Sequence, residues 1–157
     1  MSLEPTNFEG GLEINSLIQY GVAKVKVTSA QLLALNATPQ TIVEAPGEGK
    51  FLELVSATVH KPAGTAYAGI AAGEDLAIKY TNGSGTQVNT SLETTGFLDQ
   101  TTAETRVTHA STTAAIEPVE NAALVLQLLT GEITTGTSDL YVTVYYRVVR
   151  DFDVEPL

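Results

Sequence analysis

Residues 42–61 constrain the fold more than any other stretch of the chain. Two apolar, β-prone runs flank a turn of sequence Pro46-Gly47-Glu48-Gly49. Pro at the second turn position and Gly at the third form the pattern of a type II turn. The second run, residues 51–61, is rich in β-branched residues, which fit a pleated, half-buried surface. The segment therefore predicts two strands around a turn and places the chain in the all-β class.

Alternation of apolar and polar residues predicts the other strands. Val25 and Val27 alternate with Lys24 and Lys26, as in a strand with one buried face. Together with a weaker candidate at 68–73, the expected strands number eight or nine: 22–28, 41–45, 51–61, 76–80, 88–92, 106–109, 122–130 and 139–149. Short strands separated by turn signals predict a jelly-roll-like β-sandwich of about eight strands.

Local signals refine this prediction at three places. Thr28 or Ser29 is placed to cap one helical turn over residues 30–35. The sequence Asn82-Gly83-Ser84-Gly85 predicts a hairpin turn. In the strand over 51–61, strict alternation puts Phe51, Glu53, Val55, Ala57 and Val59 on one face.

The last predicted strand carries large side chains on both faces. Alternation directs Leu140, Val142, Val144 and Tyr146 to one side and Tyr141, Thr143, Tyr145 and Arg147 to the other. Packing against the core accounts for one side. On the other side we expect Tyr141 and Tyr145 to pack against a neighbouring subunit.

The first 21 residues differ from the rest and are expected to form an extended N-terminal arm, with the domain over 22–157. Glu4, Glu9 and Glu13 occur there without any Lys or Arg. Large apolar residues are too many for a segment that stays in water. We expect four of them to contact a partner or another subunit: Leu3, Phe8, Leu12 and Ile14.

Composition argues against several classes of function. The net charge is −10, from 18 acidic and 8 basic residues, and no basic stripe is present to displace phosphate counterions, so we expect no nucleic-acid partner. The chain has no cysteine, which excludes disulfides and thiolate zinc sites. Neither a secretory signal nor an apolar run long enough to span a membrane is seen. We expect synthesis in a cytoplasm and no membrane partner.

No motif with a chemical mechanism emerges, so the expectation is a protein without enzymatic activity or a cofactor. His60 and His109 lie in predicted strands without the Gly-x-Ser-x-Gly sequence of a hydrolase elbow or zinc-ligand spacing. Glu74-Asp75 and Asp151-x-Asp153 offer carboxylates for calcium, but neither has the alternating oxygen ligands of an EF-hand loop. A calcium site and a carboxylate pair for sugar hydrolysis stay as the open alternatives.

The order of several segments between residues 22 and 150 resembles a group of small structural proteins of tailed bacteriophages. The segments are Val25 to Pro39, Ala45 to Lys50, Gly64 to Tyr67, Leu76 to Tyr80, Gly96 to Asp99, Val119 to Leu126 and Val142 to Val149. Proteins of this kind resemble head decoration, or cement, proteins, which are often jelly-roll trimers seated on the capsid. The N-terminal arm lies outside the resemblance.

The resemblance implies a virion protein on the outer capsid surface. It implies a homotrimer that binds the major capsid protein and stabilises the head after synthesis in the host cytoplasm. The alternative is a receptor- or glycan-binding module of a phage tail or head fibre. That alternative predicts aromatic or carboxylate-lined sites in the loops at residues 64–67 and 131–138.

Overall fold

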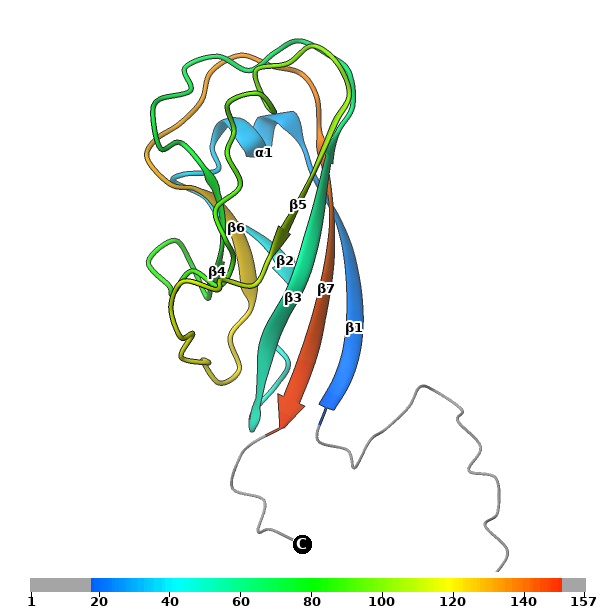
Figure 1. Cartoon of the computed structure of the whole chain (residues 1–157), viewed down its shortest axis with the longest axis vertical. Coiled ribbons are helices and arrows are strands. Elements are labelled where there is room, and N and C mark those ends of the chain that lie inside the picture. The colour runs from blue at the N-terminus through cyan, green and yellow to red at the C-terminus, as the bar shows by residue number, and fades with distance from the viewer. Residues whose placement is uncertain (1–17, 151–157) are drawn as a thin grey trace, which may run out of the picture.

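The computed structural model describes residues 18–150, which form a two-layered antiparallel β-sandwich (Figure 1). The all-β class expected from the sequence is confirmed. The elements, in chain order, are β1 (Ile18–Val27), α1 (Ser29–Leu33), β2 (Gln40–Val43), β3 (Lys50–Lys61), β4 (Leu76–Tyr80), β5 (Glu104–His109), β6 (Leu124–Leu128) and β7 (Leu140–Arg150).

The chain passes from one sheet to the other at every connection between these strands. Odd-numbered strands make a four-stranded sheet of order β1-β7-β3-β5, and even-numbered strands make a three-stranded sheet of order β2-β6-β4. The segment after β4 turns back on it through the bridges Lys79–Gln87 and Leu76–Leu92. This segment is the short strand expected at 88–92, present as isolated bridges.

β7 is one of the two inner strands of the larger sheet. It pairs with β1 along ten residues, from Ile18–Val149 to Val27–Leu140. Its other edge pairs with β3 from Lys50–Arg150 to His60–Tyr141. The first and last strands are therefore hydrogen-bonded neighbours in the sheet. β1 begins at Ile18, so residues 18–21, expected in the arm, belong to the sheet.

A β-bulge in β3 overturns the expected alternation of that strand. The register with β7 shifts between Leu54 and Ser56, which leaves Val55 unpaired. An extra residue moves every later side chain to the opposite face. Leu52 and Leu54 are buried before the bulge, and Ala57 and Val59 are buried after it. The prediction that Phe51, Glu53, Val55, Ala57 and Val59 share a face was therefore wrong.

The turn at 46–49 joins two different sheets, since β2 and β3 do not pair with each other. Gly47 has φ +100°, the left-handed conformation that the third position of a type II turn requires. The N–H of Gly47 donates to Asn121 Oδ1 at 2.9 Å, and the N–H of Gly49 donates to Glu120 Oε1 at 2.7 Å. The turn is thus fastened to the residues that precede β6.

Thr28 is the N-cap of α1, as one of the two sequence alternatives stated. Its Oγ1 accepts from the N–H of Gln31 at 3.2 Å, and Gln31 Oε1 accepts from the N–H of Thr28 at 2.8 Å, which completes a capping box. The short helix closes one end of the sandwich and directs Leu32 and Leu35 into the core.

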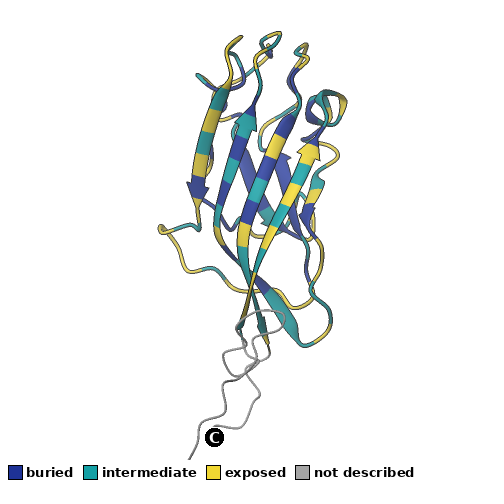
Figure 2. Cartoon of the chain, turned by 90° about the vertical axis from the view of Figure 1, so that its right-hand side faces the viewer, coloured by how far each residue is buried: buried dark blue, intermediate teal, exposed yellow. Residues whose placement is uncertain are grey.

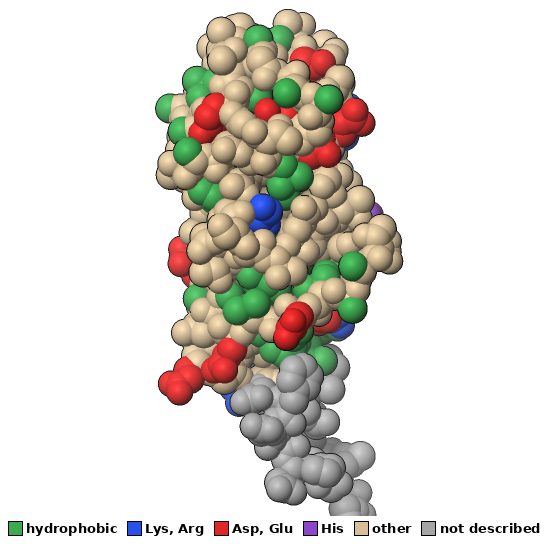
Figure 3. All heavy atoms as spheres, turned by 90° about the vertical axis from the view of Figure 1, so that its left-hand side faces the viewer, with side chains coloured by type: hydrophobic (Ala, Val, Ile, Leu, Met, Phe, Trp, Pro, Cys, Tyr) green, Lys and Arg blue, Asp and Glu red, His purple; other side chains and the backbone are tan. Residues whose placement is uncertain are grey.

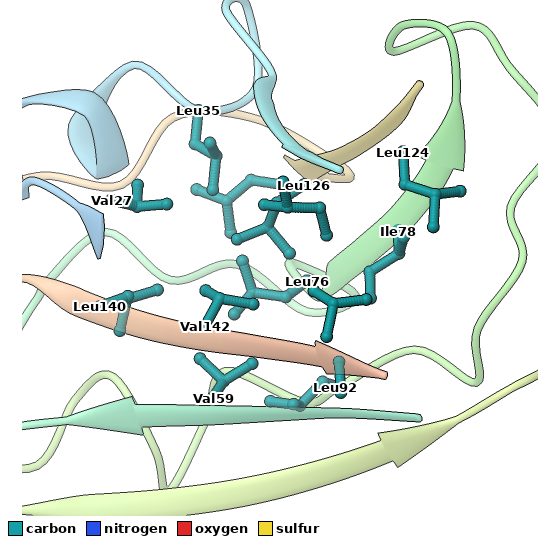
Figure 4. Packing of buried hydrophobic residues seen from close by; sticks show 14 of the residues in the cluster. Val27, Leu35, Val59, Leu76, Ile78, Leu92, Leu124, Leu126, Leu140 and Val142 are labelled. Carbon is teal, nitrogen blue, oxygen red and sulfur yellow. The ribbon is translucent and has the colours of Figure 1, made fainter. Parts of the chain in front are cut away.

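The core lies between the two sheets and is built from inward-facing aliphatic side chains. Figure 4 shows residues of both layers pointing toward one another, among them Val59 and Val142 from the larger sheet and Ile78, Leu124 and Leu126 from the smaller one. All five are at most 1% exposed. Burial on this scale stabilises by about 25 cal/mol for each Å² of apolar surface removed from water.

Buried polar groups fasten the loops at the upper end of the sandwich in Figure 1. Lys61, at the end of β3, is fully buried, and its ammonium donates to the carbonyls of Pro62, Gln100 and Thr102 at 2.8–3.2 Å. Its pKa is lowered by burial, which outweighs the attraction of Glu104 and Asp99.

Two buried tyrosines make similar links. Tyr67 Oη donates to the carbonyl of Ser138 at 2.6 Å, and Tyr80 Oη donates to the carbonyl of Leu52 at 2.5 Å. Burial raises the pKa of each phenol to about 12 from the ordinary value of 10.0, with a smaller contribution from Asp139 or Glu53.

The raised phenol pKa values predict a loss of stability in alkali. Between pH 10 and pH 12 the unfolded chain loses the protons of Tyr67 and Tyr80 while the folded chain keeps them, so the free energy of unfolding falls as the pH rises through this interval. Urea unfolding at several pH values measures the slope. The variant Tyr67→Phe/Tyr80→Phe should show a shallower slope there; an unchanged slope would contradict the assignment.

Replacement of Lys61 by Met should destabilise the domain by about 1–3 kcal/mol, because three buried carbonyls lose their donor. Chemical denaturation gives the difference. Lys24→Met is the matched control, since Lys24 is exposed on β1, and it should change the free energy of unfolding by less than about 0.5 kcal/mol. Equal effects of the two substitutions would show that the hydrogen bonds of the buried Lys61 ammonium do not stabilise the fold.

Candidate functional site

The candidate site is the outer face of the four-stranded sheet. The smaller sheet covers the inner face, and no part of residues 18–150 forms a layer over the other side (Figure 2). We use "outer face" for its outward side chains: Tyr20, Val22, Lys24 and Lys26 on β1, Tyr141, Thr143, Tyr145 and Arg147 on β7, Glu53, Val55, Ser56, Thr58 and His60 on β3, and Thr105, Val107 and His109 on β5.

Most of the exposed large apolar side chains of the described residues lie on this face. Tyr20 is 67% exposed and Val22 is 55% exposed, and Tyr141, Tyr145, Val55 and Val107 are exposed as well. Cross-strand pairing gathers them, since Val22 lies directly opposite Tyr145. Contiguous apolar surface with a polar rim is typical of sites that bind other macromolecules.

A shallow depression of about 390 Å³ occupies the end of the outer face nearest the start of β1. Its lining comprises Tyr20, Gly21, Val22, Val55, Ser56, Tyr145 and Tyr146. Gly21 shapes its floor, because a Cβ at this position would lie 2.4 Å from the Tyr146 ring. The bulge contributes Ser56, which strict alternation would have placed on the buried face with Leu52 and Leu54.

Charge on the outer face is opposite in sign to that of the chain. The face has three cations, Lys24, Lys26 and Arg147, and one carboxylate, Glu53, whereas the whole chain has a net charge of −10. Arg147 pairs with Glu53 at 2.9 Å, and Lys26 pairs with Asp139 at the sheet's end at 2.8 Å.

Asp139 ties the outer face to the start of the helix. Its carboxylate accepts from Lys26 and from the backbone N–H of Ser29, and these hydrogen bonds lower the pKa of Asp139. The same contact raises the pKa of Lys26. Lys26 therefore stays charged at the rim.

The two histidines both lie on the outer face but not beside each other. His60 is paired with Thr105, and its Nδ1 is 2.8 Å from Thr105 Oγ1. His109 is paired with Ser56, which lies four positions before His60 in β3, so the two histidines are ~13 Å apart along the strands. The structure does not bring them together as a shared metal or catalytic pair.

A second concave region lies at the open edge of the sandwich. A cleft of about 460 Å³ is bounded by the connection between β5 and β6 and by the ends of β3 and β4, with Phe51, Tyr80, Val88 and Ile116 among its apolar lining. The side of the molecule in Figure 3 shows hydrophobic side chains gathered across its lower half, where this connection runs, with acidic side chains around them.

The carboxylates proposed for calcium are used otherwise. Glu74 is buried, and its Oε1 accepts from the N–H groups of Thr130 and Gly131 at 3.3 and 2.9 Å. Asp151 and Asp153 lie outside the described residues. Within residues 18–150, no three His, Asp or Glu side chains come together so that they could hold a metal ion. In the same part of the chain, no helix is long and apolar enough to cross a membrane.

The loops expected to present an aromatic ligand site pack on each other instead. Tyr67 is 2% exposed, with its ring against Gly136 and its hydroxyl on Ser138. Backbone hydrogen bonds join Ala68 and Thr134 in both directions. The exposed aromatic site that the alternative of a receptor- or glycan-binding module predicts for residues 64–67 is therefore not seen in these residues.

The structure places only part of the predicted contact set. Tyr141 and Tyr145 lie on the outer face, whereas Leu3, Phe8, Leu12 and Ile14 lie outside the described residues. The sequence analysis missed Tyr20, because the arm was expected to extend to residue 21, and it assigned no contact to Val22, which begins the strand predicted at 22–28. Their alternation with Gly21 and Ala23 was the available signal.

Comparisons of the chain with protein-family models, with curated proteins and with solved structures found no match.

If the outer face is a surface and not part of the core, substitution of its exposed side chains should leave the fold intact. Tyr20→Ser and Tyr145→Ser should each lower the free energy of unfolding by less than about 1 kcal/mol, the size of one cross-strand pair. Leu140→Ala, on the buried side of β7, should cost about 2–5 kcal/mol. Thermal and urea unfolding of the three variants make the comparison; similar losses at all three positions would contradict it.

Proposed function

We propose that the protein is a head decoration, or cement, protein of a tailed bacteriophage. It binds the outer capsid surface as a homotrimer, contacts the major capsid protein and stabilises the head mechanically. The proposal assigns it no catalytic reaction and no cofactor, and it places the protein in the virion after synthesis in the host cytoplasm.

The outer face is the observation that carries this proposal. A four-stranded sheet exposes tyrosines and valines together with cations in a chain that is otherwise acidic. Tyrosine and arginine, both present on this face, are enriched in protein–protein contacts. A face that is bare in one copy and rich in such residues suits a protein that works by assembly with other copies or with a shell.

The strand order supports a jelly roll, the architecture that the resemblance implies. The larger sheet has the order β1-β7-β3-β5, the chain changes sheets at each connection, and residues 87 and 92 bridge to β4 as a fourth strand of the smaller sheet would. Jelly rolls have eight strands in two sheets and recur in viral capsid proteins. The order of the sequence segments between residues 22 and 150, which resembles that in phage structural proteins, supports the proposal further.

Copy number tests the proposal directly. Quantitative mass spectrometry of purified virions should find hundreds of copies of the chain for each head, in a fixed ratio to the major capsid protein. When the purified protein is added to heads that lack it, the heads should bind it in the same ratio. They should then resist heat or chelator treatment better than heads without the protein. A handful of copies for each virion would overturn the proposal.

The cleft between the β5–β6 connection and the sheet ends favours one alternative, a binding module of a tail or head fibre. Its apolar lining and the Glu53–Arg147 ion pair at its edge are features of sites for small or glycan ligands. Hits on a glycan array together with a low copy number would support this alternative. An array without hits, alongside stoichiometric head labelling, favours decoration.

The arm has a predicted role in attachment. Deletion of residues 1–15, which removes Leu3, Phe8, Leu12 and Ile14, should abolish binding to heads while the β-sandwich stays folded. Co-sedimentation with heads measures binding, and circular dichroism checks the fold. The full-length variant Val119→Ser, which changes a single exposed side chain that is not on the outer face, is the control and should keep most of its binding. Full binding by the truncated protein would contradict the prediction.

A further inference from the structure

We infer that the depression on the outer face receives the N-terminal arm, residues 1–17, of a second copy of this chain. As an account of how copies assemble on a head the inference rests on the proposed function, but its observations and its test concern the purified protein alone.

The position of the depression relative to the arm is the first observation. Strand β1 begins at Ile18, and Tyr20 and Val22, the first outward side chains that line the depression, follow within four residues. Both are more than half exposed. An apolar surface that begins where an apolar terminal segment joins the domain is in reach of that segment in any closely packed oligomer.

Chemical complementarity is the second observation. The arm has large apolar residues at Leu3, Phe8, Leu12 and Ile14, which suit a depression lined by tyrosine and valine. Its charged side chains are Glu4, Glu9 and Glu13, with no Lys or Arg. The outer face has Lys24, Lys26 and Arg147 against Glu53 and, at its rim, Asp139; these two carboxylates pair with Arg147 and Lys26, and the charge of Lys24 is the excess. Acidic arm and basic face attract each other, and apolar contacts then hold them.

The length of the arm is sufficient. Seventeen extended residues span ~55 Å, whereas β1 is ~33 Å long and the sheet is ~15 Å wide from β1 to β5. The arm can therefore reach a neighbouring copy and still place several apolar residues on its outer face.

Chain direction favours a second copy over the arm's own domain. Because β1 begins at Ile18 and the depression lies beside its first residues, a chain that continued the line of β1 backwards would have to reverse to cover its own depression. Such a reversal, at Gly10-Gly11 or at Asn15-Ser16, uses arm residues for a turn and takes them out of contact with the face. A second copy needs no reversal.

Exchange of arms between identical copies has a thermodynamic advantage. Each arm adds contacts to an interface that is repeated around a closed ring, and linked weak contacts reinforce one another. The same contact removes the tyrosines and valines of the depression from water, which the isolated domain leaves exposed.

Disulfide capture between full-length chains tests the inference. Because the chain has no native cysteine, only the introduced cysteines can form disulfides. One chain has Val22→Cys, and a second, differently tagged chain has a cysteine in place of Leu3, Phe8, Leu12 or Ile14. The two chains are co-expressed, purified together and oxidised. We expect at least one arm position to give a linked species of twice the chain mass, several-fold above the control.

The control is Val107→Cys on the same outer face. Val107 is 57% exposed, matched to Val22 at 55%, but it lies on β5, away from the depression. Collisional oxidation should affect both positions equally.

Three outcomes would overturn the inference. The first is linkage to Val22→Cys no greater than to Val107→Cys at all four arm positions. The second is a bond formed only within one chain that has both cysteines, which would assign the depression to the chain's own arm. The third is a full-length protein that sediments as a monomer at every concentration. None of these depends on heads, so the inference and the decoration function fail separately.

Discussion

The mutual burial of the two inner sheet faces is the constraint on which the rest of the structure depends. A sheet buries one face well when another layer covers it, and here each sheet is the only layer available to the other among residues 18–150. β7 shows the consequence. Its Leu140, Val142 and Val144 fill the core, while Tyr141 and Tyr145 stay on the outside of the same strand. The outer face is therefore left bare by the same packing that makes the core.

The loops around the core are fastened by buried polar groups that act on backbone atoms. The ammonium of Lys61 holds three carbonyls, the phenols of Tyr67 and Tyr80 hold one each, and the carboxylate of Glu74 holds two N–H groups. A buried backbone group without a partner costs free energy, so long connections need such side chains when they lie outside a ladder. Glu74 offers a carboxylate for calcium in the sequence, but in the fold its polar atoms, like those of Lys61, Tyr67 and Tyr80, hold the backbone.

Much of the fold was predictable from local pattern, and much of the candidate site was not. The turn at 46–49, the cap at Thr28 and the two faces of β7 follow from residue type and alternation, and the structure confirms all three. The face of β3 was predicted wrongly because a bulge adds one residue without any mark in the alternation. The tyrosine at position 20 was missed because β1 extends back to Ile18 through its pairing with β7, a partner more than 120 residues away in the sequence.

The sequence by itself determined the class of the fold, the approximate positions of most strands and the acidic charge of the arm, because these depend on residue type and near neighbours. Only the tertiary structure decided which apolar residues stay outside. Tyr20, Val22, Val55 and Tyr145 come from three strands, and the depression they line exists only once β1, β7 and β3 lie side by side in that register. Register between distant strands is set by the packing of the whole sandwich, and no local pattern encodes it.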